Sequence, residues 1–414
     1  MSAINLAFKK AYRECRFLGK ITPLNIFYAL TFDFFKSRGK TNIMHKFLGW
    51  KKSDKNPLLK YYDAHLSFLF GDYQKTISIL KKLTRLYPQH ADMAFLLSET
   101  YRLEDKKELA RDILEGTLEH SHRLKTWLLL ANLTVNNEDH QRLKSLWLLY
   151  KKKGKIPAHH YELDSYISTS AMRSKNYGEA IELWKDFIQK TINKEAIFPS
   201  NGSKRKFSSG SASKALIDLK NVFKNAGIEF FLVSGTLLGC IREGKLLGHD
   251  KDIDVGVWSD VRTEDIFNQV KKSGLFYIQA TRSSLALRIK HVNGTAIDIF
   301  LHFRENDNYW HGGSKLKWNN TPFSLDTYEF LNDEYLIPAD YDLYLTENYG
   351  DWRTEKPDFD SAFDTPNASL LSNPELVVHT YKKLARSIHL DESQKINLNI
   401  NILKNLGEEN IFLK

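Results

Sequence analysis

The chain has 414 residues, which is enough for two or three domains. Hydrophobic residues make up 42% and charged residues 27%, which excludes disorder over most of the length. The net charge of +10 is uneven, because residues 1–57 contain twelve Lys and Arg against three Asp and Glu. A nucleic-acid-binding protein usually spreads its charge over a folded face, so we expect no nucleic-acid partner. Cys15 and Cys240 form no disulfide framework, which indicates a reducing compartment.

The basic N-terminal arm spans residues 1–56 and contains an apolar run at 23–35. That run is shorter than the roughly 20 residues that cross a bilayer, and no signal-peptide cleavage site follows it. One interpretation is a helix lying in an anionic membrane interface. The better-supported one is a helical cap that packs on the next domain. We therefore expect a cytoplasmic protein, with peripheral contact at the inner face of the membrane as the open alternative.

Internal repeats are predicted over residues 57–195. Polar turns at Asp72, Asp105, Asp139 and Asn176 follow one another at steps of 33, 34 and 37 residues, each before a helical apolar pattern. The pattern resembles tetratricopeptide repeats, in which stacked helix pairs form a curved solenoid. Two interpretations stay open: a concave surface for a partner protein or glycan, and a rigid spacer.

A linker is predicted at 196–213, where Gly, Ser and basic residues cluster, and the periodicity changes after it. The following domain, 214–370, mixes helical and strand patterns around a small sheet, and a helical tail occupies 371–414. The predicted fold class is therefore α+β, with an all-α solenoid before a mixed α/β domain. Its predicted helices are 215–225 and 262–273, and its predicted strands are 228–233, 253–258, 286–292 and 296–301.

Three carboxylates within that domain carry the predicted chemistry. Asp252 and Asp254 alternate in a strand, so their side chains project from one face and repel each other. A divalent cation relieves the repulsion, and hard oxygen ligands select Mg²⁺ or Mn²⁺. Asp298, inside another apolar strand, is a third metal ligand or the base that accepts a proton. Asp250 stands at the strand entry, next to these predicted catalytic and metal-binding residues.

A Gly-Thr turn precedes the carboxylates, and further blocks follow them. The strand at 228–233 runs into SGTLLG (234–239), where glycine and a helix start favour a phosphate. The other blocks are IR (241–242), HDKDIDVG (249–256), IDIF (297–300), WHG (310–312), IP (337–338), YL (344–345) and YGDW (349–352). Over about 215–365 this pattern resembles the LicD and fukutin family, which has a nucleotidyltransferase fold.

The resemblance implies a phosphotransferase of the LicD/fukutin type. Such an enzyme moves a phosphoalcohol, for example phosphocholine or ribitol phosphate, from a CDP-linked donor to a hydroxyl of a surface glycan such as lipopolysaccharide, capsule or a teichoic-type polymer. Many members carry a tryptophan and a further aspartate where this chain has His249 and Lys251. The donor or phosphate positions that we predict are Ser234, Gly235, Thr236, Arg242, His249, Lys251 and Arg288.

Alternatives remain at this point. The same carboxylates suit a nucleotidyltransferase that uses an NTP, and a non-catalytic repeat scaffold is a second alternative, against which the intact aspartates argue. Histidines near the predicted sheet are donor contacts or packing residues, and tryptophans there form an aromatic wall or part of the core. These residues are His291, His302, His311, Trp310, Trp318 and Trp352.

Overall fold

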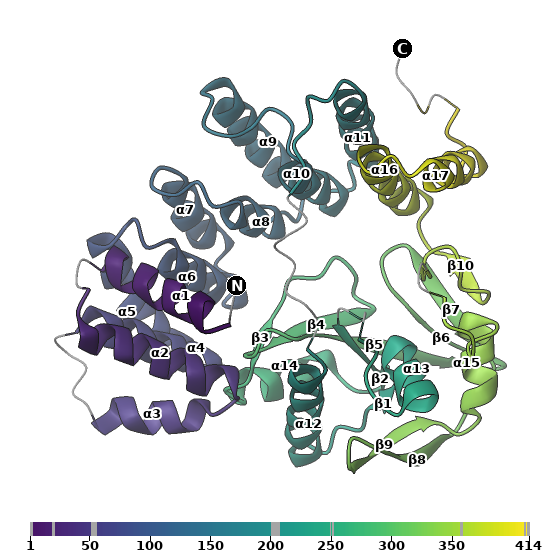
Figure 1. Cartoon of the computed structure of the whole chain (residues 1–414), viewed down its shortest axis with the longest axis horizontal. Coiled ribbons are helices and arrows are strands. Elements are labelled where there is room, and N and C mark those ends of the chain that lie inside the picture. Colours follow the sequence, from purple (N-terminus) through teal and green to yellow (C-terminus); the bar gives the residue numbers. More distant parts are fainter. Residues whose placement is uncertain are drawn as a thin grey trace. The chain divides into compact units, whose positions relative to one another are not determined.

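The chain forms two compact units, residues 1–90 with 205–371 and residues 91–204 with 372–414 (Figure 1). This computed structural model describes residues 3–18, 21–50, 56–199, 208–248, 250, 252–356, 359–409 and 411, so residues 200–207 of the predicted linker lie outside it. A helical N-terminal part followed by a mixed sheet confirms the α+β class. Among the described residues, no helix combines the length and apolar character needed to cross a membrane.

The N-terminal arm packs as a layer of helices on the next helix pair. Phe32 stacks on Tyr62 with ring centroids 4.0 Å apart, and the Tyr62 hydroxyl donates to the buried Glu14 carboxylate at 2.7 Å. His65 lies 2.6 Å from the Tyr277 hydroxyl, which joins these helices to the sheet of the same unit. The helices are α1 (Ala3–Phe17), α2 (Pro23–Ser37), α3 (Thr41–Trp50), α4 (Pro57–Leu69) and α5 (Tyr73–Leu86).

Helix pairs recur along the predicted repeat region, and three of the four predicted turns are where the sequence indicates. The turn at Asp139 is wrong: the Asn136 side chain accepts the Asp139 N–H, so α9 begins earlier. Asp139 then lies buried in the first helical turn, where it pairs with Lys107 and Arg111. The helices are α6 (Ala91–Leu103), α7 (Lys107–Leu118), α8 (Lys125–Asn132), α9 (Asn137–Lys152), α10 (Tyr161–Arg173) and α11 (Tyr177–Ile192).

The tail helices α16 (Asn373–His389) and α17 (Ser393–Asn405) belong to the same unit as α6–α11. Trp184 and Phe187 of α11 share one buried cluster with Tyr381 and Leu384 of α16. The tail therefore adds a further helix pair to the core of this unit.

The mixed domain contains a ten-stranded sheet, not the small sheet that the sequence predicts. Along the main path the order is β10-β7-β6-β5-β2-β1-β9-β8, and β4 pairs with β5 and β3. The strands are β1 (Phe231–Leu232), β2 (Asp252–Trp258), β3 (Phe276–Ile278), β4 (Ala286–His291), β5 (Ala296–Glu305), β6 (Asn308–Gly312), β7 (Leu316–Asn320), β8 (Leu325–Phe330), β9 (Asp333–Pro338) and β10 (Ala368–Leu370). Its helices are α12 (Ser209–Asn225), α13 (Ser234–Glu243), α14 (Thr263–Lys272) and α15 (Tyr341–Tyr349).

The centre of the sheet has one apolar face and one polar face. In β2 the alternate residues Ile253, Val255 and Val257 are buried, and β5 repeats this with Ile297 and Ile299. Because successive strand side chains point to opposite faces, the aspartates of both strands share the other face. The sequence therefore fixes which face of the sheet can become a polar site.

Gly256, in the middle of β2, provides a test of this packing. A Cβ there would lie 2.6 Å from the Phe231 ring and 2.7 Å from His302, and both rings are buried. We expect Gly256→Ala to destabilise this unit by about 1–3 kcal/mol because the rings have no space to move into. The measurement is equilibrium unfolding monitored by circular dichroism. Gly210→Ala, where an added Cβ meets nothing within 4 Å, is the matched control, and an equal loss in both variants would contradict the assignment.

Candidate active site

The register of three adjacent strands gathers the predicted carboxylates. The strands β2 and β5 run parallel with Asp254 opposite Asp298, and β4 runs antiparallel to β5 with Arg288 opposite Asp298. Asp252 lies two residues before Asp254, on the same face of β2. One row across the sheet therefore holds two carboxylates and a guanidinium, with a third carboxylate beside it.

Arg288 binds the carboxylates directly. Its Nε and one terminal nitrogen donate to the two Asp298 oxygens, each at 2.6 Å, and the same terminal nitrogen donates to Asp252 at 3.2 Å. These hydrogen bonds, the Asp298 pair first, raise the pKa of the Arg288 guanidinium above its usual value. The guanidinium thus compensates two of the three negative charges.

Asp254 is the most enclosed of the three carboxyl groups. Burial raises its pKa well above the usual value, and the nearby charges of Asp252, Asp250 and Asp298 add to the effect. Its backbone N–H donates to the Thr236 hydroxyl at 2.8 Å, and the Gly235 backbone hydrogen-bonds to its carboxylate. The Gly-Thr turn therefore fixes the position of Asp254.

The turn itself is tightly packed. Val233 is the last extended residue, and Ser234 begins α13 with a positive φ of 48°. A Cβ on Gly235 would clash with the Asp250 carboxylate, so only glycine lets Asp250 approach the start of the helix this closely.

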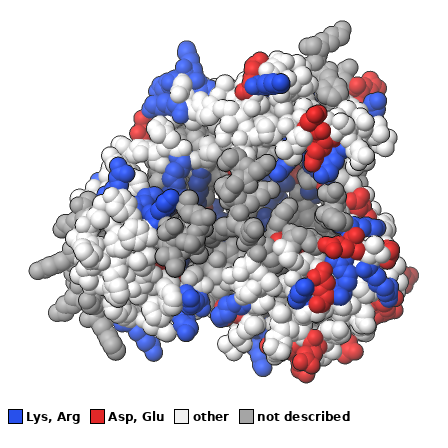
Figure 2. Space-filling model, viewed as in Figure 1, with Lys and Arg blue, Asp and Glu red and all other residues white. Residues whose placement is uncertain are grey.

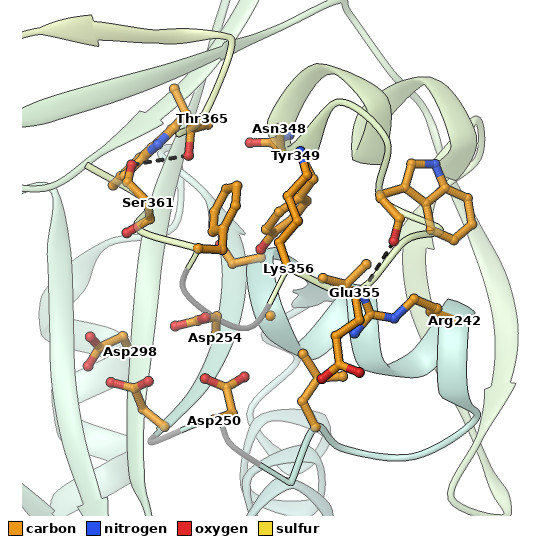
Figure 3. A pocket seen from close by; sticks show the side chains of 18 of the residues that line it. Arg242, Asp250, Asp254, Asp298, Asn348, Tyr349, Glu355, Lys356, Ser361 and Thr365 are labelled. Carbon is orange, nitrogen blue, oxygen red and sulfur yellow. Dashed lines mark hydrogen bonds between the residues drawn. The ribbon is translucent and has the colours of Figure 1, made fainter. Parts of the chain in front are cut away.

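A cavity of about 630 Å³ opens over these residues, a size typical of small-molecule sites. Figure 3 shows Asp250, Asp254 and Asp298 gathered on one side of it, with Tyr349 and Lys356 facing them and Arg242 further along. The residues that line the cavity are Ser234, Gly235, Leu238, Arg242, Leu247, Asp250, Asp252, Asp254, Asp298, Phe300, His311, Trp318, Asn348, Tyr349, Asp351, Trp352, Thr354, Glu355, Lys356, Phe359, Ser361 and Thr365.

Aromatic side chains form one wall. His311 and Trp318 stack with ring centroids 5.2 Å apart, and His311 also stacks on His302 at 4.3 Å. Burial lowers the pKa of His302 to about 3 and that of His311 well below its usual value, so both rings are neutral at pH 7. Trp310 instead stacks on Phe303, outside the cavity lining.

His291, the third histidine near the sheet, does not reach the cavity. It is buried beside Asp218, 3.0 Å away, and so is a packing residue.

The YGDW block contributes three residues to the cavity lining: Tyr349, Asp351 and Trp352. Gly350, with φ 66°, ends α15, and the chain after it continues along the cavity.

The predicted phosphate positions fall into three groups. Ser234, Gly235 and Arg242 line the cavity, and Arg242 also donates to the Trp352 carbonyl at 3.2 Å. Thr236 is buried behind Asp254, and Arg288 lies beside the carboxylates without forming part of the lining. His249 and Lys251 lie outside the described residues.

Several lining residues were missed by the sequence analysis. Asn348, Glu355, Lys356, Ser361 and Thr365 come from α15 and the segment after it. The nearby YGDW block was the available signal, but it marks only where this segment begins. The exposed ammonium group of Lys356 adds a positive charge opposite the carboxylates.

The donor set suits a hard divalent cation, because carboxylate oxygens are the preferred ligands of Mg²⁺ and Mn²⁺. Burial and, after it, the neighbouring carboxylates raise the pKa of Asp254, and a cation would neutralise the negative charge of those neighbours. With Arg288 holding Asp298 and Asp252, the described part of the chain contains no group of three or more His, Cys, Asp or Glu arranged to hold a metal ion.

Comparison with known proteins finds a family model and several relatives that match part of the chain. Residues 227–340 match the family model described as LicD/FKTN/FKRP, nucleotidyltransferase domain. The chain is similar to the ribitol-5-phosphate transferase FKTN of Mus musculus, with 29% identity over 165 residues, which cover 35% of this chain and 36% of the relative. The human FKTN is 27% identical over 167 residues, covering 38% and 36% respectively. An uncharacterized protein of Rickettsia typhi is 26% identical over 148 residues, covering 33% and 44%.

The family model covers the Gly-Thr turn and the carboxylates at 252, 254 and 298. The chain spans about a third of the length of the FKTN relatives, 36% in each case. The match ends at residue 340, so the cavity wall contributed by α15 and the segment after it lies beyond the family model.

Asp254→Asn tests the charge at the centre of the site. In the folded chain Asp254 retains its proton above the pH, about 4, at which an unfolded carboxyl loses it. Wild-type stability therefore falls as pH rises from about 4 toward the raised pKa, whereas the amide is uncharged throughout. Without divalent cations we expect the variant to have the higher melting temperature at pH 7, and the difference to vanish near pH 4.

The measurement is the melting temperature of both proteins across that pH range. Asp260→Asn, at an exposed carboxylate just beyond β2, is the control and should change the melting temperature little. A constant difference at all pH values would show that folding does not raise the pKa of Asp254.

Proposed function

We propose that this chain, whose residues 227–340 form a domain of the LicD/fukutin type, is a phosphotransferase that moves a phosphoalcohol from a CDP-linked donor to a glycan hydroxyl. The observation that carries the proposal is the pairing of Asp254 with Asp298 beside Asp252 on the floor of the cavity. The FKTN relatives are ribitol-5-phosphate transferases, which makes ribitol phosphate the first alcohol to test.

The proposed reaction is a single displacement at phosphorus. The acceptor hydroxyl oxygen forms a bond to the phosphorus that carries the alcohol, and the bond from that phosphorus to the CMP oxygen breaks. CMP departs with the bonding electron pair, and the hydroxyl proton passes to a carboxylate of the site. Positioning and electrostatics supply most of the rate, so the protein forms no covalent intermediate.

The chain's own residues have distinct roles in this proposal. Ser234, at the α13 N-terminus, lines the cavity and contacts the donor phosphates, while the Gly235 backbone stays bonded to the Asp254 carboxylate. Arg242 and Lys356, both lining the cavity, add positive charge where the diphosphate lies. The aromatic wall of His311 and Trp318 excludes water and offers ring faces to a sugar or a base.

A divalent cation completes the site. We propose that Asp252, Asp254 and Asp298 hold Mg²⁺ or Mn²⁺, which would neutralise charge on the diphosphate and on the departing CMP. To hold it, Asp298 and Asp252 would exchange part of their contact with Arg288 for the cation. Arg288 would remain as a fixed positive charge at the edge of the site.

The assay measures CMP released from CDP-ribitol, CDP-choline and CDP-glycerol, with a glycan acceptor, and pyrophosphate released from NTPs. We expect CMP from one of the three donors and no pyrophosphate. Asp252→Asn should lower the rate by roughly three orders of magnitude or more, because the charged transition state loses several kcal/mol of stabilisation. Asp260→Asn should leave it unchanged.

If only pyrophosphate appears, the NTP-using alternative replaces this proposal. If no product appears with any donor, and Asp252→Asn leaves the cell's glycans unaltered by ³¹P NMR, the domain is a scaffold.

Arg288→Gln tests the exchange between guanidinium and cation. Removing the two 2.6 Å hydrogen bonds frees the Asp298 oxygens, so we expect Mn²⁺ to bind at least several-fold more tightly. The measurement is Mn²⁺ titration followed by electron paramagnetic resonance, which needs no substrate. Arg262→Gln, which removes an exposed arginine paired with Asp265, is the matched control. Unchanged Mn²⁺ affinity in Arg288→Gln would show that the cation binds without displacing the guanidinium.

A further inference from the structure

The helix α2 is apolar on two opposite sides. Its inner side buries Tyr28, Ala29 and Phe32 against the rest of the first unit. Its outer side exposes Phe27 and Phe34, which are 60% and 50% exposed, and the exposed Leu24 precedes Phe27 by one helical turn. A helix with apolar residues on both sides is normally buried on both sides. The outer side of α2 is instead exposed to solvent, which is typical of a binding surface.

Exposed aromatic side chains are concentrated in this part of the molecule. Apolar side chains exposed elsewhere in the described ranges are leucine, isoleucine and valine, whereas every strongly exposed aromatic one belongs to α1 or α2. The exposed aromatic residues are Phe8, Tyr12, Phe17, Phe27 and Phe34. Such a concentration is typical of a binding surface and not of a random solvent-exposed face.

The charge around this surface is positive. The two acidic residues described in α1 and α2 bind other residues of the chain. Glu14 is buried and accepts a hydrogen bond from Tyr62, and Asp33 forms an ion pair with Lys10. The Arg38 guanidinium carbon lies 3.6 Å from the centroid of the Phe34 ring, so a cation–π contact links a positive charge to an exposed aromatic ring. The exposed basic residues are Lys9, Arg13, Arg16, Arg38, Lys40 and Lys46. Figure 2 shows an uncharged area over this part of the chain with Lys and Arg along its border.

We propose that the outer surface of α1 and α2 binds an anionic lipid bilayer. Phenylalanine side chains enter the boundary between headgroups and acyl chains, and the surrounding Lys and Arg contact lipid phosphates. A bilayer satisfies both halves of the surface, because its interior accepts the aromatic rings and its headgroups carry the opposite charge. An apolar protein groove would cover the rings but would place no negative charge opposite the surrounding Lys and Arg. This inference is independent of the proposed reaction.

The consequence for the molecule follows from the packing. Helices α1 and α2 belong to the same compact unit as the catalytic cavity. Binding through their outer surface therefore holds the cavity near the lipid surface without any further segment.

The experiment is co-flotation of the full chain with vesicles. Wild-type protein should float with vesicles of phosphatidylcholine and phosphatidylglycerol, and only weakly with phosphatidylcholine alone. Adding salt should weaken binding to the mixed vesicles, because exposed charges are screened. Phe27→Ser with Phe34→Ser should weaken binding by roughly tenfold for each ring removed from the bilayer. Both rings are exposed, so the melting temperature should stay at the wild-type value.

The matched control removes two exposed apolar side chains elsewhere. Leu148 and Leu149 of α9 are 49% and 44% exposed, and Leu148→Ser with Leu149→Ser should bind vesicles as wild type does. Failure of the wild-type chain to float with either vesicle overturns the proposal and leaves a protein partner as the explanation of the surface. Equal binding by the phenylalanine double variant also overturns it, as does salt-independent binding to both kinds of vesicle.

Discussion

The parallel pairing of β2 with β5 is the constraint on which the site depends. Placing Asp254 opposite Asp298 sets two carboxylates side by side on one face, with Asp252 next to them. A shift of one residue in either strand would bring isoleucine or valine to that face and bury an aspartate in the apolar core. The buried side chains of Ile253, Val255, Ile297 and Ile299 therefore do more than fill the core. They oppose the one-residue shifts that would turn the aspartates into the apolar core.

The remaining features of the site compensate for the charge that this register concentrates. Arg288 comes from the third strand in the row and neutralises Asp298 and part of Asp252. Burial raises the pKa of Asp254, the charges of Asp252, Asp250 and Asp298 raise it further, and the hydrogen bond from the Gly235 backbone offsets only part of this. An active site that retains an uncompensated carboxyl at its centre gives up stability for the capacity to bind something positive. A site arranged for stability alone would place a second guanidinium here.

The sequence predicts the site from local patterns and misses what depends on tertiary pairing. Strands β2 and β5 were predictable because their apolar residues alternate with aspartates, and α13 was predictable from the Gly-Thr turn. Strands β6 and β7 were not, because each has only five residues and contains Asn, which is depleted in strands. The ion pair between Arg288 and Asp298 depends on an antiparallel register that no local pattern encodes. The same holds for Lys356, which reaches the cavity from the segment after α15.

The two interpretations of the basic arm, which the sequence set against each other, concern different sides of the same helices. The inner side of α2 is a cap: Phe32 stacks on Tyr62 of α4, and α4 in turn contacts Tyr277 of the sheet domain. Because this side already buries the residues needed to hold the helix, the aromatic residues on the outer side contribute little to folding. Solvent-exposed phenylalanine is unfavourable in an isolated protein, since it promotes association. Their presence beside Arg38, on the side of the helix that does not pack against α4, is therefore better explained by selection for binding than by selection for the fold.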